Sequence, residues 1–154
     1  MQTFKKISYR TLLLLFVLSF QMTFAQSEKD VREAEIINIE REIVGKLTGH
    51  IPIKGKKTVE SRYTDAERKL VANYLFDLLE EQGLKPQKND YNVKDKKGNT
   101  FTGSNIYAEI PATNGSDEYV FITAHYDTAK DSPGAVHNAT GVAIAYYVAK
   151  KMAE

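Results

Sequence analysis

The stretch from Ile122 to Gly141, ITAHYDTAKDSPGAVHNATG, contains two of the three histidines of the chain. The apolar run before it predicts a short strand over residues 118–124, of the kind that is buried on both faces of a mixed sheet. This strand ends at His125, with Asp127 two residues on, and a Pro-Gly loop then leads to His137. Ligands of open α/β sheets collect at the carboxyl ends of strands, so both imidazoles are expected to converge there.

The segments around this stretch predict the rest of an α/β fold. Helical spacing of apolar residues indicates three helices, which begin near Ser27, Thr64 and Thr140. The first two end before Gly49 and Gly83, and the second opens with a capping box of Thr64 and Glu67. Strands at 90–94 and 100–110 flank a turn at 95–99, which predicts a hairpin.

Composition and charge are those of an ordinary globular domain. The 154 residues are 42% hydrophobic and 27% charged, which permits a packed core of one domain at most. The formal net charge of +1, without blocks of like charge, does not indicate a surface for nucleic acid or anionic membrane. The chain has no cysteine and therefore no disulfide, so burial or metal binding must stabilise it.

The N-terminus has the three parts of a secretory signal peptide. Three basic residues, Lys5, Lys6 and Arg10, precede a short apolar run, and Thr23-Phe-Ala25 provides small residues before a cleavage site. We expect cleavage after residue 25, which divides the chain into a leader of residues 1–25 and a mature part of residues 26–154. The alternative, an uncleaved anchor, needs about 20 apolar residues, and this run is shorter. The expected location is secreted or periplasmic, with no membrane span after cleavage.

The histidines have a metal-binding interpretation and a simpler one. An imidazole at His125 can bind a metal ion, and the Asp127 carboxylate can fix the tautomer of a ligand. Alternatively, His125 is an ordinary histidine at the edge of the core, and His137 is a solvated turn residue. Two imidazoles are fewer than the three protein ligands that a catalytic zinc usually has. His50 lies in a basic loop and is expected to be exposed, and no serine shows the histidine-acid arrangement of a serine hydrolase.

Three consecutive motifs resemble the first half of a zinc aminopeptidase of the M28 family. They are GSNIYAEIP at 103–111, FITAHYD at 121–127 and SPGAVHNATG at 132–141, and the resemblance extends over residues 60–154 with SRYT at 61–64 and EEQGL at 80–84. It implies the mixed-sheet, zinc-exopeptidase-like fold, also described as phosphorylase/hydrolase-like, here incomplete at the C-terminus. It also implies that His125 is a zinc ligand and that Asp127 is the catalytic carboxylate, which contacts the ligands without binding zinc itself.

The sequence departs from the family pattern at His137. The family has at this position an aspartate that bridges two zinc ions, and Thr140 stands where serine is usual. Asp131 is out of register and does not replace the aspartate. A neutral imidazole offers one lone pair to one metal, so we expect at most one zinc ion, held by His125 and His137. The general-base glutamate and the other ligands of the family would come from segments beyond residue 154, which suggests a truncated or degenerate copy.

The resemblance therefore predicts an exported zinc-dependent aminopeptidase-like protein that acts on peptide substrates. Two alternatives stay open at this point. One is a non-catalytic exported domain that retains the fold for binding, which His137 and the missing base favour. The other is a single-zinc enzyme similar to the glutaminyl cyclases.

Overall fold

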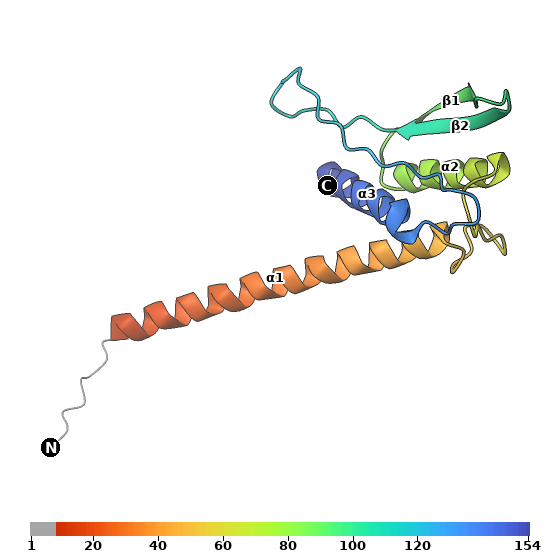
Figure 1. Cartoon of the computed structure of the whole chain (residues 1–154). Coiled ribbons are helices and arrows are strands. Elements are labelled where there is room, and N and C mark those ends of the chain that lie inside the picture. The colour runs from red at the N-terminus through yellow and green to blue at the C-terminus, as the bar shows by residue number, and fades with distance from the viewer. Residues whose placement is uncertain (1–8) are drawn as a thin grey trace. The chain divides into compact units, whose positions relative to one another are not determined.

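The computed structural model describes residues 9–154, which divide into two compact units. The boundary between the units lies between Asn38 and Ile39, inside the long helix α1, Tyr9–Leu47. The second unit contains the last turns of α1 and every other element shown in Figure 1. Among the helices of residues 9–154, none has a stretch that is both long enough and apolar enough to cross a membrane.

Helix α1 starts earlier than the sequence predicts. A start near Ser27 was expected, but the helix is continuous from Tyr9, because residues 9–47 contain no proline and only one glycine, Gly45. The predicted end is confirmed. Helix α1 ends at Leu47, and Gly49 adopts a left-handed φ of 83°, a conformation that glycine reaches at little cost.

Helix α2, Asp65–Glu80, begins with the predicted capping box. The Thr64 side chain accepts a hydrogen bond from the backbone N–H of Glu67, and the Glu67 carboxylate accepts one from the backbone N–H of Thr64 at 2.8 Å. Two backbone donors at the start of the helix are thereby satisfied. Gly83 follows the helix with a φ of 75°, so the predicted end is also confirmed.

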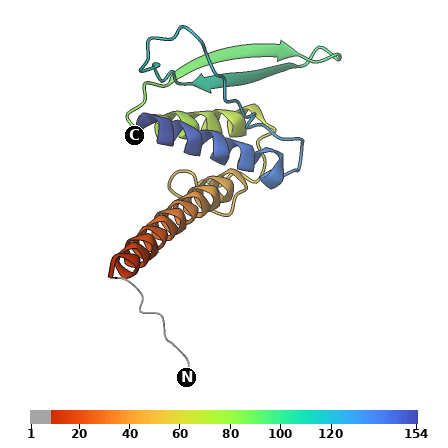
Figure 2. The ribbon, with the colours of Figure 1, turned by 90° about the vertical axis from the view of Figure 1, so that its left-hand side faces the viewer.

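The predicted hairpin is present. Strand β1, Gln87–Lys94, pairs antiparallel with β2, Thr100–Tyr107, and Gln87 lies opposite Tyr107. The Asp95 carboxylate closes the turn by accepting hydrogen bonds from the backbone of Lys97 at 2.8 Å and of Asn99 at 2.9 Å. Figures 1 and 2 show α2 and α3, Thr140–Ala153, on the same side of the hairpin.

The core of the second unit lies where three helices meet. Buried residues of α1, α2 and α3 form one cluster with Val59 from the loop between α1 and α2: Ile43, Leu47, Val71, Tyr74, Val142 and Ala143. Ala139, immediately before α3, is also fully buried in this cluster. The start of α3 is therefore held against the core, and so is the C-terminal end of the loop that leads into it.

The strand expected over residues 118–124 is not formed, and this prediction was wrong. These residues have no regular structure, and Val120 and Phe121 are 87% and 83% exposed. An apolar segment becomes a buried strand only where neighbouring strands pair with it, and in the part of the chain that the structure describes the sheet consists of β1 and β2 alone. The fold is α/β in general kind, with helices and a small antiparallel sheet.

Candidate metal centre

His125 and Asp127 lie on one side of an extended segment that packs against the core. Alternate residues Ala124, Tyr126 and Thr128 are half-buried, and the first two contact the hydrophobic cluster. Successive side chains of an extended chain point in opposite directions. His125 and Asp127 are therefore both turned towards solvent, and the Tyr126 hydroxyl fixes the segment by donating to the Ser104 carbonyl of β2 at 2.9 Å.

The side chains of His125 and Asp127 contact each other. Nδ1 of His125 lies 3.2 Å from Oδ1 of Asp127 and 3.3 Å from its carbonyl oxygen. With Nδ1–H donating to these oxygens, the lone pair of the imidazole is on Nε2, the nitrogen that would bind a metal ion. Both side chains are well exposed, so their pairing orients the ring but contributes little to stability.

His137 reaches the same place from the other end of the loop. It lies in a short π-helical turn, Ala135–Ala139, where its own φ and ψ and those of Asn138 are not helical. The turn is anchored by the buried Ala139, whose N–H donates to the Gly134 carbonyl at 3.0 Å. The Asn138 amide donates to the His125 carbonyl at 3.4 Å and joins the two segments directly.

The result is a pair of imidazole rings in contact. The ring centroids of His125 and His137 are 4.6 Å apart, and the rings meet edge to face at 66°. His137 follows His125 by twelve positions in the chain, and the structure brings the two together at the end of the Pro-Gly loop as the sequence suggested. Asp131, with a left-handed φ of 56°, is exposed in that loop.

The distance between the two rings meets one requirement for two ligands of a single zinc ion. Zinc binds imidazole nitrogen at about 2.0–2.1 Å, so two rings on one ion must lie close together, as these do. A third ligand is lacking within the described range, since residues 9–154 contain no group of three or more His, Cys, Asp or Glu side chains that could hold a metal ion. His50, the remaining histidine, is exposed as expected and pairs with the Thr48 hydroxyl at 3.0 Å.

Sequence reasoning assigned no role to Arg62, which connects to both histidine segments. It is fully buried, and its side chain donates to the backbone carbonyls of Tyr126, Pro133 and Gly134. Its position in the loop before a capping box is no signal of burial, because arginine is mostly exposed in proteins. Only the folded structure reveals these contacts.

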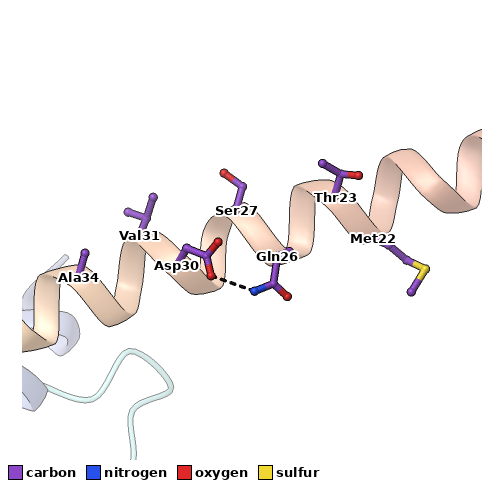
Figure 3. Close-up of a pocket in the computed structure, with 7 residues that line it drawn as sticks. All are labelled: Met22, Thr23, Gln26, Ser27, Asp30, Val31 and Ala34. Atoms are coloured by element: carbon purple, nitrogen blue, oxygen red, sulfur yellow. Dashed lines mark hydrogen bonds between the residues drawn. The ribbon is translucent and has the colours of Figure 1, made fainter.

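A hollow on α1 offers a less suitable site. Seven residues of this single helix line it: Met22, Thr23, Gln26, Ser27, Asp30, Val31 and Ala34. Figure 3 shows them side by side along the helix, with Gln26 donating a hydrogen bond to Asp30 at 2.9 Å. The only titratable group among them is Asp30, so the hollow gathers no set of metal ligands.

A pair of imidazoles beside a carboxylate is a feature of metal-dependent hydrolases. Residues 105–154 match the model of peptidase family M28, and this part of the chain is therefore related to that family of peptidases. The matched residues include His125, Asp127 and His137, whereas the SRYT and EEQGL segments lie outside the match. No curated protein and no solved structure matches the chain.

Proposed function

We propose that this protein is an exported zinc-dependent aminopeptidase-like protein, in which His125 and His137 hold one zinc ion and Asp127 orients His125. The proposal is carried by the contact between the two imidazoles, 4.6 Å apart, inside the residues that match a peptidase family. A form of the protein that supplies the remaining ligands would have the larger mixed sheet of a zinc exopeptidase and would take a peptide with a free amino terminus as substrate.

The chemistry of the site follows from which groups are present. A bound zinc ion would polarise a peptide carbonyl and acidify water. Asp127 would keep Nε2 of His125 unprotonated for the metal through its contacts to Nδ1, at 3.2 and 3.3 Å. Both histidines are exposed, so a peptide has access to the site. The matched stretch brings no glutamate to the histidines as a general base, and we therefore expect weak zinc binding and no turnover from residues 26–154 alone.

The alternative, a non-catalytic domain that binds rather than cleaves, is favoured by one observation. His137 lies where the resemblance expects a carboxylate that bridges two metal ions, and an imidazole cannot bridge them in this way. The two functions differ in what His137→Asp would do. In a form of the protein that supplies the remaining ligands, His137→Asp would make an aminopeptidase site bind more zinc ions per chain and would raise its activity. Equal metal content in both forms would show that residue 137 does not have the bridging position.

Zinc titration of the chain tests the proposal directly. We expect weak binding by calorimetry that His125→Ala abolishes and that His50→Ala, the matched change of an exposed histidine outside the pair, leaves intact. An absence of zinc binding by the wild-type chain, or equal binding by His125→Ala, would contradict the proposal. Turnover of an aminoacyl anilide that requires both zinc and His125 would show that residues of this chain suffice for catalysis.

A further inference from the structure

Arg62 connects the two segments that carry the histidines. Its guanidinium donates to the carbonyl of Tyr126, the residue after His125, and to the carbonyls of Pro133 at 2.7 Å and Gly134 at 3.1 Å. Its backbone N–H donates to the Thr128 hydroxyl at 2.8 Å, and its carbonyl accepts from the Thr128 N–H at 3.4 Å. One residue therefore holds both the chain after His125 and the turn before His137.

The other end of this network is the core. The guanidinium also donates to the carbonyl of Leu47, the last residue of α1, which is fully buried. Carbonyls at a helix C-terminus lack partners within the helix and interact favourably with a cation. The histidine segments are thus tied through Arg62 to the rigid end of a helix rather than to another loop.

The fit around the guanidinium is tight. A Cβ atom added to Gly134 would lie 2.6 Å from Nη2 of Arg62 and 2.4 Å from Cγ2 of Thr128. Burial lowers the pKa of Arg62, and the charges of Asp127 and Glu67 oppose that shift. An arginine stays charged at neutral pH, and its planar fork can reach several carbonyls at once, whereas a lysine ammonium is a single point donor.

We propose that Arg62 is the positioning residue of the imidazole pair: by holding the carbonyls of Tyr126, Pro133 and Gly134 on one guanidinium, it sets the separation of the His125 and His137 rings. This inference rests on the proposed function only where zinc affinity is the quantity measured. The position of the rings is a property of the metal-free chain and can be measured without metal.

The test compares Arg62→Lys with Arg68→Lys in the full chain. Arg68 is the matched control, because it also donates to backbone carbonyls, those of Tyr63 and Thr102, but to none beside a histidine. In the zinc-free protein we expect the nuclear Overhauser contact between the rings of His125 and His137 to be lost in Arg62→Lys and kept in Arg68→Lys. Zinc affinity should fall about ten- to a hundredfold in Arg62→Lys alone, as for other residues that orient metal ligands.

The outcomes separate the two proposals. A folded Arg62→Lys with the ring contact and zinc affinity of the wild type, or equal losses in Arg68→Lys, would overturn the role of Arg62. If the wild type binds no zinc, the metal site is refuted. If the ring contact is nevertheless lost in Arg62→Lys, the positioning role of Arg62 still holds. If circular dichroism shows Arg62→Lys unfolded, Gly134→Ala decides. Its added Cβ would lie 2.6 Å from Nη2 of Arg62 and would displace the guanidinium from the neighbouring carbonyls, so unchanged rings in this variant would overturn the proposal.

Discussion

At Gly134, backbone conformation and packing both exclude a side chain. Its φ is 57°, in the left-handed region, and its carbonyl accepts hydrogen bonds from Arg62 and from the N–H of Ala139. Gly55 has nearly the same φ, 60°, but an added Cβ would meet nothing within 4 Å. The two glycines therefore separate the cost of the backbone conformation from the cost of crowding.

We predict that Gly134→Ala destabilises the protein more than Gly55→Ala. The left-handed conformation alone costs alanine about 1–2 kcal/mol, and forcing a methyl group into a filled space adds about 1–3 kcal/mol. Urea denaturation of both variants measures the difference in the free energy of unfolding. Equal losses of stability would show that the space between Gly134, Arg62 and Thr128 is not as tightly packed as the structure has it.

At the level of elements, the start of α2 depends on one carboxylate. Burial acts to raise the pKa of Glu67, but hydrogen bonds from Thr64, Ser61 and the Tyr63 backbone outweigh this and hold the pKa below its ordinary value of 4.5. A carboxylate whose pKa is lowered by folding stabilises the folded state at pH values above its ordinary pKa. This stabilisation disappears as the pH falls through the lowered pKa.

We therefore predict that Glu67→Gln is less stable than the wild type at neutral pH and that the difference shrinks as the pH falls below 4.5. Thermal unfolding from about pH 7 to about pH 3 measures it. Glu118→Gln, which changes an exposed carboxyl side chain in a loop, is the control. A difference that stays constant over this range would mean that ionisation of Glu67 does not stabilise the helix start.

A second test at the level of elements asks whether residues 118–124 form a buried strand or an exposed segment. Val120 is 87% exposed and Val71 in α2 is fully buried. We predict that Val120→Lys changes the free energy of unfolding by no more than about 0.5 kcal/mol, as exposed substitutions usually do. Val71→Lys should prevent folding, because it would bury an unpaired charge. Comparable damage from both variants would support the strand that the sequence suggested.

For the whole molecule, the expected signal peptide raises the question of which residues remain after its cleavage. The expected cleavage site lies within α1, after Ala25, and the boundary between the two compact units lies further along the same helix, after Asn38. The core residues of the second unit all come from Ile43 onwards, so loss of residues 1–25 would remove none of them.

We predict that the protein recovered outside the cytoplasm begins at Gln26. Intact-mass measurement decides this, and a mass that retains residues 1–25 would contradict it. In Ala25→Phe a bulky side chain occupies the position before the expected cut, and signal peptidases require a small residue there, so this variant should stay uncleaved.

The features that the sequence predicted correctly are local ones. The capping box of Thr64 and Glu67, the glycine ends of α1 and α2, and the Asp95 turn each depend on residues a few positions apart, whose side chains interact with the nearby backbone. The relationship to peptidase family M28 could also be recognised from contiguous motifs, and the family match confirms it for residues 105–154. His125, Asp127 and His137 were selected from such motifs, and their roles stay predictions.

The tertiary structure decided what depends on distant partners. The secondary structure of the apolar run at 119–124 is not determined by its own residues, because a strand needs backbone partners from other segments. The described residues supply no such partners. Arg62 likewise could not be identified from sequence, since its contacts reach Leu47, 15 residues away, and Gly134, 72 residues away. Hydrogen bonds of that span exist only once packing has excluded water from the guanidinium and left backbone carbonyls as its acceptors.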